Sequence, residues 1–362
     1  GYASAAQCAP TRAGLMTGRY QESFGFYYNP PAATNPAYPR FGLPADEVTL
    51  GQALQRQGYV TGLVGKWHLG FKPEQFPLQR GFDSFFGILD GGHVYLGSQP
   101  GVPIYRGTAK VTEKSYLTRA FARESVAFIH AHAHEPFFLY AAFTAVHAPL
   151  QAEPAMLQRF AAIPDLRRRT FAAMLASLDD AVGEIVRALA RDGLTRDTLV
   201  LFLSDNGGPT FTTTSSNGPL RSGKGSSYDG GIRVPFFLAW PGHLGAGQLY
   251  RRPVISVDLF PTILALAGID SSQTPRNDGV SLMPYLGRQA HPSPRTWLYS
   301  EQFTRSFNTD WQRAARDSRY KLIERYDGTR EFYDLSMDVF ETRNLLEGSL
   351  TSGQRSALDR LD

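Results

Sequence analysis

The chain has 362 residues, 42% of them hydrophobic and 19% charged, with a formal net charge of +4 and one cysteine. This composition is typical of a globular protein and excludes a disordered one. A small charge without a basic stripe interleaved with aromatic residues argues against a nucleic-acid partner. No run of about 18 apolar residues indicates a membrane span, and a lone cysteine excludes an internal disulfide. We therefore expect no nucleic-acid or membrane partner, and the sequence leaves the oligomeric state open.

Helices and apolar strands alternate along most of the chain. A capping-box helix at 49–57 leads into a β-branched strand at 59–64, and a helix at 116–134 precedes an apolar strand at 137–143. Apolar residues at spacings of three and four predict an amphipathic helix over 171–189, which an apolar strand follows. Strands that are apolar throughout are typical of buried parallel sheets. The alternation predicts an α/β fold with a mostly parallel central sheet flanked by helices.

The pattern changes near Asp270. Beyond this point the chain is rich in Pro, Ser and Arg, and short strands such as RYKLI and REFYDL are separated by turns without crossover helices. This arrangement is typical of antiparallel strands. We predict a larger α/β domain over 1–269 and a smaller antiparallel α+β subdomain over 270–362.

Polar residues follow several of the apolar strands, where ligands collect in an open α/β sheet. These candidates, together with a lysine in the stretch GKGSSYDGG, are Lys66, His68, His147, Asp205, Asn206 and Lys224. Each alone has an ordinary explanation, such as a turn at Asn206-Gly207 or an exposed amine in a flexible loop at Lys224. Together, the Asp and Asn oxygens suit Ca²⁺ or Mg²⁺, while the basic side chains suit a tetrahedral oxyanion. The set indicates cleavage of a charged ester.

The stretch CAPTRAGLMTGR, which begins at Cys8, supplies a candidate nucleophile. Pro10 near the first turn, and the run from Thr11 to Arg19 without a breaker except Gly14, predict a helix that begins here. The positive end of the helix dipole favours negative charge at Cys8. The alternative is that Cys8 is a small buried hydrophobe, as most free cysteines are.

These residues resemble a known family. Cys8-x-Pro-x-Arg, followed by TGR at 17–19, is similar to the signature of the type I sulfatases, in the alkaline-phosphatase-like superfamily. GKWHLG, VHAP, SDNGG, GKGSSYDGGIRVP and the tail YDLSMDVFETRNL resemble the family's later motifs, in the same order. The resemblance implies a sulfatase that acts on a sulfated carbohydrate or an aryl sulfate. It also implies a periplasmic or extracellular location.

The resemblance assigns a specific chemistry to Cys8. A maturation enzyme, of the formylglycine-generating or the anaerobic sulfatase-maturating type, would oxidise Cys8 to formylglycine (3-oxoalanine). One hydroxyl of the hydrated aldehyde would attack sulfur, and loss of the second hydroxyl's proton would expel sulfate and restore the aldehyde. The implied catalytic residues are Cys8, Arg12, Lys66, His68, His147 and Lys224.

The same resemblance implies a role for each of the other residues. Arg12 would orient the formylglycine, and Lys66 with His68 would hold the hydrate and the sulfate. His147 and Lys224 would lie by the bridging oxygen, where His147 protonates the departing alcohol. The cation would polarise the sulfate oxygens. The implied ligands of this cation, calcium or magnesium, are the modified Cys8, Asp205 and Asn206.

The chain departs from the family at its beginning. Family members start with an apolar strand that ends in two adjacent aspartates, which complete the metal site, and the residues at 1–7 are too few for such a unit. We therefore expect an N-terminally truncated chain. Two alternatives stay open: a phosphohydrolase of the same superfamily, which Cys8 argues against, and a catalytically impaired sulfoglycan-binding relative, which the missing aspartates favour. His93 is a weaker candidate for contact with a sugar.

Overall fold

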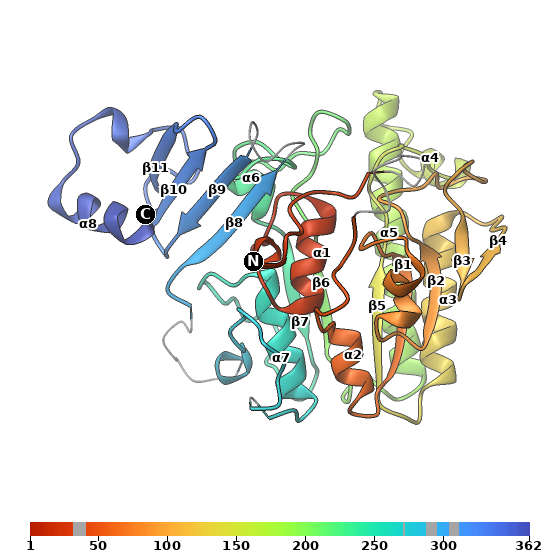
Figure 1. The fold of residues 1–362 in the computed structure, drawn as a ribbon. Helices are drawn as coiled ribbons and strands as arrows, with labels where there is room; N and C mark the ends of the chain where they lie inside the picture. The colour runs from red at the N-terminus through yellow and green to blue at the C-terminus, as the bar shows by residue number, and fades with distance from the viewer. Residues whose placement is uncertain (32–40, 271, 287–294, 304–310) are drawn as a thin grey trace.

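A five-stranded sheet organises the larger part of the molecule (Figure 1), in a computed structural model that describes residues 1–31, 41–270, 272–286, 295–303 and 311–362. The strand order is β4-β3-β2-β1-β5. The strands are β1 (Val60–Lys66), β2 (Ser84–Ile88), β3 (Ile104–Arg106), β4 (Ala109–Val111) and β5 (Phe137–Ala142). β1 pairs in parallel with both β2 and β5, while β3 and β4 extend the sheet as an antiparallel hairpin. The parallel centre confirms the predicted α/β class.

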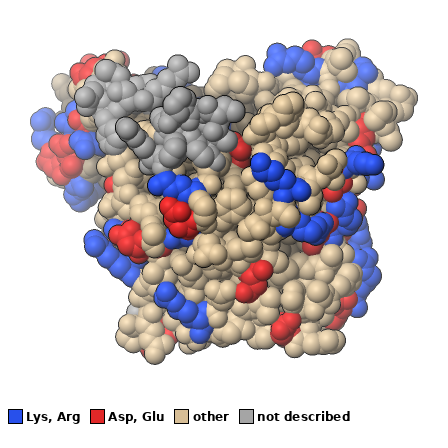
Figure 2. Space-filling view, turned by 45° about the vertical axis from the view of Figure 1, so that its right-hand side comes forward, with Lys and Arg blue, Asp and Glu red and all other residues tan. Residues whose placement is uncertain are grey.

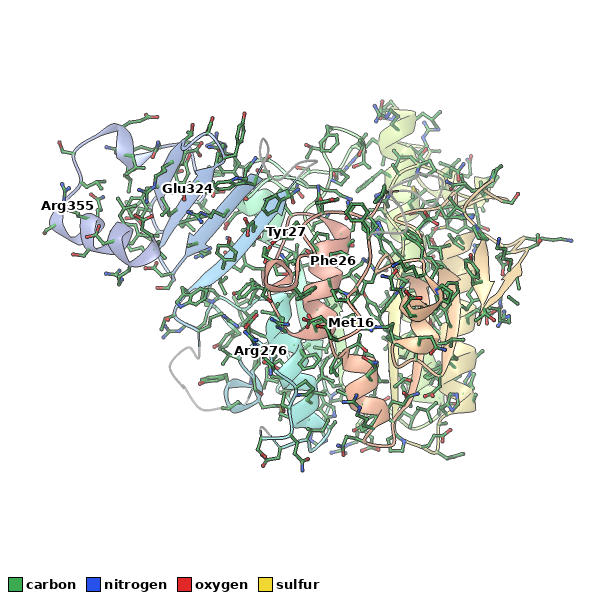
Figure 3. All side chains as sticks on the ribbon, in the orientation of Figure 1. Met16, Phe26, Tyr27, Arg276, Glu324 and Arg355 are labelled. Carbon is green, nitrogen blue, oxygen red and sulfur yellow. The ribbon has the colours of Figure 1, made fainter. Side chains whose placement is uncertain are left out.

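Helices cover both faces of this sheet. On one face pack α1 (Cys8–Thr17), α2 (Leu50–Gln55) and α7 (Leu259–Leu266), and on the other α3 (Leu117–Ala131), α4 (Pro154–Arg159) and α5 (Leu166–Arg191). Side chains of β1 alternate between the two cores. Leu63 lies in the first core, together with Met16 of α1 (labelled in Figure 3), and Val64 lies in the second. This alternation is the two-residue period of a strand buried on both sides.

Two strands differ from the prediction. β6 (Val200–Leu203) pairs antiparallel with β7 (Phe236–Ala239) in a separate two-stranded sheet, and within the described residues it does not join the large sheet. Phe202 and Phe237 on this ribbon are exposed. β5, predicted to be buried, is the last strand of its sheet and is mostly half-buried. An apolar run predicts a strand, but it does not specify how many neighbours that strand has.

The C-terminal part forms a four-stranded antiparallel sheet (Figure 1), which confirms the predicted α+β character. Its strands, in the order β11-β10-β9-β8, are β8 (Leu298–Phe303), β9 (Trp311–Arg316), β10 (Tyr320–Arg325) and β11 (Arg330–Asp334). Helix α8 (Ser352–Leu361) packs on β10. Glu324 on the sheet and Arg355 on the helix are labelled in Figure 3. The domain boundary at 269/270 stays a prediction.

Short elements connect these layers. They are α6 (Asp229–Ile232) and the 3₁₀ turns η1 (Gln21–Phe24), η3 (Pro73–Gln75), η4 (Pro77–Gln79), η5 (Ser256–Asp258), η6 (Met283–Tyr285) and η7 (Leu345–Glu347). Acidic and basic side chains are interspersed on the face seen in Figure 2. Across the described ranges, every helix is too short or too polar to cross a membrane.

Candidate active site

The N-terminus of α1 places Cys8 inside the protein. Gln7 is extended and Cys8 is the first residue of the helix, whose first turn holds no acidic residue. Asn29 Oδ1 accepts a hydrogen bond from the Ala9 N–H at 2.9 Å and satisfies one of the free donors at this end. Lys224 Nζ lies 2.9 Å from Cys8 Sγ. The dipole of the helix and the ammonium group therefore both favour negative charge at this position.

Arg12, one turn further along α1, joins the ends of two strands. Its Nε and Nη2 donate to Asp205 Oδ2 at 3.0 and 2.9 Å, just after β6. Its Nη1 donates to the Lys66 carbonyl at 3.0 Å, at the end of β1, and to the Tyr140 hydroxyl at 3.3 Å. Burial alone would raise the pKa of Asp205, but the charges of Arg12 and Lys66 outweigh it and hold that pKa well below its usual range.

Lys66 and His68 are buried in the same region, and their pKa values respond to the other cations. Burial lowers the pKa of Lys66 to about 8. Burial and the charges of Lys66 and Arg12 hold the pKa of His68 well below its usual value, so its imidazole is neutral at pH 7. The Nδ1 atom of His68 is buried and has no hydrogen-bond partner among the described residues. Its ring is confined by Gly91, where a Cβ atom would lie 2.7 Å from Nε2.

His147 lies in the loop after β5, and its backbone contacts fix its ring. Its Nδ1 is 2.7 Å from the carbonyl oxygen of Ala148, so the neutral imidazole carries its proton there and leaves Nε2 as an acceptor. The His147 carbonyl accepts a hydrogen bond from the Tyr95 hydroxyl at 3.0 Å. A Cβ atom at Gly92 would lie 3.3 Å from Nδ1, so the glycine pair at 91–92 packs against both histidines.

The chain supplies oxygen donors for part of a cation site. Asn206 Oδ1 is buried without a hydrogen-bond partner in the described part of the chain, while its Nδ2 donates to the Gly207 carbonyl at 2.8 Å. Such an orphaned oxygen, next to the Asp205 carboxylate, fits a hard divalent cation. No group of three or more His, Cys, Asp and Glu side chains that could hold a metal lies within the described ranges. The residues therefore fit a cation but account for only part of its coordination.

The structure brings the predicted residues to one region. Hydrogen bonds connect Arg12 to Asp205 and to the Lys66 carbonyl, and Lys224 to Cys8. The electrostatic neighbours of His68 include Lys66 and His147, and Asn206 follows Asp205 in the chain. His93 is buried beside this region, with its Nδ1 2.6 Å from the Val94 carbonyl.

Sequence reasoning missed two features of the site. Tyr140 contacts Arg12 from inside β5, and its hydroxyl in the otherwise apolar run FFLYAAF was the available signal. The second feature is the glycine pair at 91–92, whose tight packing against the two histidines has no signal in the sequence beyond the pair itself.

The fold and the site together define a class: an α/β protein with a cluster of cationic side chains around a cysteine at a helix N-terminus. The chain belongs to the sulfatase family, whose model, described as Sulfatase, matches residues 1–269. A second family model, described as N-sulphoglucosamine sulphohydrolase, C-terminal, matches residues 223–360. These matches confirm the resemblance seen in the motifs.

Individual relatives agree with this assignment. The chain is 35% identical over 306 residues to N-acetylgalactosamine-6-sulfatase of Homo sapiens, covering 79% of this chain and 58% of that protein. It is 32% identical over 401 residues to arylsulfatase A of Homo sapiens, covering 96% and 75%. The solved structure of Ps i-CgsB in complex with k-i-k-neocarrahexaose superposes with a TM-score of 0.91 at 31% identity, covering 99% of this chain and 81% of that chain. The chain thus spans less than two thirds of the first of these relatives.

Proposed function

We propose that this chain hydrolyses a sulfate ester of a carbohydrate, with formylglycine formed from Cys8 as the nucleophile. The observation that carries the proposal is the ammonium of Lys224 at 2.9 Å from Cys8 Sγ, in a cluster of cations that also includes Arg12 and Lys66. A sulfate ester is an anion, and fixed cations in a buried site stabilise the charge that develops on its oxygens. Membership of the sulfatase family supports the same reaction class.

In this proposal, Cys8 Sγ stands in for the two hydroxyl oxygens of the hydrated aldehyde. One hydroxyl would lose its proton as its oxygen bonds to sulfur, the bond between sulfur and the ester oxygen would break, and the ester oxygen would leave as an alcohol after gaining a proton. The second hydroxyl would then lose its proton, which would allow the aldehyde carbonyl to form and the bond between its carbon and the sulfate oxygen to break. Water adds to the aldehyde and restores the hydrate, so one water molecule is consumed in each turnover.

His147 and Lys224 are the proposed groups beside the leaving oxygen. Burial and the charges of Lys224 and Lys66 lower the pKa of His147 to about 4, so it is neutral at pH 7 before the ester binds. The bound sulfate brings a negative charge, which raises the pKa of His147 and allows its Nε2 to hold a proton for the alcohol. Lys224 keeps its charge and binds a sulfate oxygen.

Asp205 and Asn206 are the proposed ligands of a divalent cation, calcium or magnesium, together with the modified Cys8. The buried and unpartnered Oδ1 of Asn206 supports this assignment. When bound, such a cation would polarise the sulfate oxygens and favour ionisation of the hydrate. Arg12 holds the Asp205 carboxylate in place, which keeps the oxygen donors of the pocket oriented.

Mass spectrometry and turnover assays test this proposal. After coexpression with a formylglycine-generating or an anaerobic sulfatase-maturating enzyme, the tryptic peptide that ends at Arg12 should carry an aldehyde in place of the CH₂SH group. The matured protein should then hydrolyse a generic aryl sulfate and lose that activity on treatment with a chelator. An intact thiol together with turnover of a phosphate ester would favour the phosphohydrolase. A matured protein that binds sulfated glycans without turnover would favour the binding relative.

A cavity beside the site supports a carbohydrate substrate. It has a volume of about 370 Å³ and is lined by Ala148, Pro149, Leu150, Leu166, Arg167, Thr170 and Thr212. Ala148 directly follows His147, so the cavity adjoins the proposed leaving-group side. Its lining combines apolar side chains with two threonines and one arginine, groups that can pack against a sugar ring and bind its hydroxyl groups. The Ps i-CgsB structure, which contains a neocarrahexaose, supports an oligosaccharide as the ligand class. A periplasmic or extracellular location stays a prediction.

Arg167→Ala tests this assignment of the cavity. We expect the KM for an acidic, sulfated oligosaccharide to rise about fivefold, the effect of losing one exposed ion pair of about 1 kcal/mol. The KM for a small aryl sulfate should not change, because this ligand does not reach the cavity. Arg187→Ala, an exposed arginine further along α5, is the matched control and should affect neither substrate. An equal rise for both substrates would contradict the assignment.

A further inference from the structure

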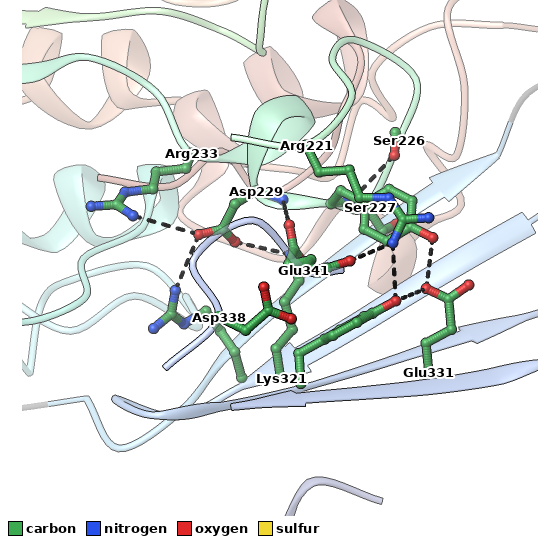
Figure 4. A network of polar contacts seen from close by, with 12 residues as sticks. Arg221, Ser226, Ser227, Asp229, Arg233, Lys321, Glu331, Asp338 and Glu341 are labelled. Atoms are coloured by element: carbon green, nitrogen blue, oxygen red, sulfur yellow. Dashed lines mark hydrogen bonds and ion pairs between the residues drawn. The ribbon is translucent and has the colours of Figure 1, made fainter. Parts of the chain in front are cut away.

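Three charged side chains are buried where the C-terminal sheet meets the segment 221–233 (Figure 4). Asp229, at the start of α6, is 1% exposed, and Lys321 on β10 and Glu341 are both 0% exposed. Lys321 Nζ donates to Asp229 Oδ1 at 2.9 Å and lies 2.8 Å from Glu341 Oε1. The Asp229 N–H donates to Glu341 Oε2 at 2.7 Å. The lysine and the two carboxylates form a closed buried triad.

This triad is costly for the fold. Removing ions from water costs several kcal/mol each, and apolar residues of similar volume often give equal or greater stability. Glu341 also has a left-handed backbone with φ of 53°, which is unfavourable for a residue with a Cβ atom. Buried charge and backbone strain at one place are typical of functional sites, where the surrounding structure holds the strained group in position.

The triad is one of several contacts by which the C-terminal sheet holds the segment 221–233. The Tyr228 hydroxyl donates to Glu331 Oε2 at 2.6 Å, and the Ser227 N–H donates to Gln312 Oε1 at 3.4 Å. The guanidinium of Arg221 lies 3.9 Å from the centre of the Tyr228 ring. The partners outside the segment lie on β9 (Gln312), β10 (Lys321) and β11 (Glu331), so three strands of the sheet hold the segment.

The opposite side of the same segment faces Cys8. The Gly225 N–H donates to the Ala6 carbonyl at 2.9 Å, and the Lys224 N–H donates to the Gly208 carbonyl at 3.3 Å. The Lys224 side chain reaches Cys8 Sγ at 2.9 Å. The segment is thus held between the C-terminal sheet and the N-terminus of α1, and the position of the Lys224 ammonium depends on both.

We propose that Lys321 and Glu341 are positioning residues for Lys224, and that they act on the active site through Asp229. Without Lys321, the two buried carboxylates repel each other and the segment that carries Lys224 moves away from the sheet. Arg316 and Arg233 lie 3.5 and 3.7 Å from Asp229 Oδ2, but neither contacts Glu341 in the described residues. This inference rests on the proposed function, in which Lys224 binds the sulfate.

A double-mutant cycle tests the proposal. In the matured protein, Lys321→Met should lower kcat for an aryl sulfate at least tenfold, with a smaller effect on KM. In a Lys224→Ala background, the same Lys321→Met substitution should cause no further loss, because the group that it positions is already absent. Arg313→Met, which removes an exposed partner of Glu324 on the same sheet, is the matched control and should leave kcat unchanged. Equal losses in both backgrounds, or full activity of Lys321→Met, would overturn the proposal.

Hydrogen exchange provides a readout that does not depend on turnover. Peptides covering 221–233 should exchange faster in Lys321→Met than in the wild type, while peptides of the large sheet should not change. If exchange is faster in Lys321→Met but the matured wild type has no sulfatase activity, the positioning role stands and the proposed function is wrong. Unchanged exchange would reject the positioning role itself. If Lys321→Met does not fold, Tyr228→Phe, which removes only the contacts of the hydroxyl, should give the same pattern with a smaller amplitude.

Discussion

At the scale of single residues, the site is a cluster of cationic side chains with few hydrogen-bond or ion-pair partners. Cys8 and Lys224 meet across 216 positions of the chain. Lys66 is 2% exposed, and its Nζ has no hydrogen-bond or ion-pair partner among the described residues. Arg12 is the one of these cations that Asp205 neutralises directly. Among the described residues, no carboxylate contacts the ammonium group of either lysine directly, so both charges remain available to an anion in the proposed reaction.

The charge of Lys66 predicts how activity depends on pH. Burial places its pKa at about 8, so the lysine is charged below this pH and loses its charge above it. We expect kcat/KM for an aryl sulfate to fall as the pH rises through about 8, because the pocket then binds the sulfate less tightly. Lys66→Arg stays charged above pH 8, so the fall in kcat/KM should move to higher pH. A wild-type profile that stays flat to well above pH 8 would contradict the role of Lys66.

The Arg12–Asp205 pair predicts an effect on stability. Arg12 is buried and Asp205 is half-buried, so Arg12→Met leaves an uncompensated, partly hydrated carboxylate and should lower the free energy of unfolding by about 3 kcal/mol, the low end for a buried pair. Arg106→Met breaks an exposed bidentate pair with Glu124 and should cost at most about 1 kcal/mol. Urea denaturation of the two variants measures this difference. Equal losses of unfolding free energy in the two variants would contradict the prediction and would mean that other groups compensate the charge of Asp205.

At the scale of elements, the ends of parallel strands and one helix assemble the site. β1 ends at Lys66, β5 leads to the loop of His147, and α1 presents Cys8 from its N-terminus. The loop after β2 closes over both histidines, and it can do so because the glycines at 91–92 leave room for the rings. The fit between this loop and the rings fixes both histidine side chains.

A methyl group at Gly91 tests this fit. The added Cβ atom would lie 2.7 Å from Nε2 of His68, so the ring must shift, and misplacing a catalytic group by about 1 Å can cost 100-fold in rate. We expect Gly91→Ala to lower kcat at least tenfold, and Gly92→Ala, whose Cβ atom would lie 3.3 Å from His147, to have a smaller effect. Gly353→Ala in α8 is the control, because its added Cβ atom would have no heavy atom within 4 Å. If Gly91→Ala has the same steady-state kinetics as the wild type, close packing at Gly91 does not position the His68 ring.

At the scale of the whole molecule, the site depends on two layers that are distant in sequence. The large sheet and α1 supply the groups that surround Cys8, and the C-terminal sheet holds the segment that carries Lys224. His68 is buried and His147 is half-buried, and the pKa of each is lowered, so both imidazoles are neutral at pH 7. Folding therefore removes two imidazoles from water in their neutral form, which couples global stability to pH.

This coupling predicts that acid destabilises the protein. The pKa values of His68 and His147 lie below the ordinary value of 6.5, so the unfolded chain binds more protons than the folded one as the pH falls. The free energy of unfolding should decrease from about pH 6.5 to about pH 4. His147→Gln should reduce the slope in this window by at most about 1.4 kcal/mol per pH unit. Urea denaturation across this range measures the slope, and identical slopes for the variant and the wild type would contradict the prediction.

The sequence by itself determined the alternation of helices and strands, the change of pattern near Asp270, and the candidate residues that the structure places near Cys8. These features are local: hydrophobic periodicity follows the geometry of each element, and the reactive side chains stand directly after strands or in short motifs. Only the tertiary structure decided that β6 leaves the large sheet to pair with β7, that Tyr140 contacts Arg12, and that Lys321 is buried between two carboxylates. Such pairings join positions far apart in the chain, and no local pattern specifies which distant side chain fills the space beside another.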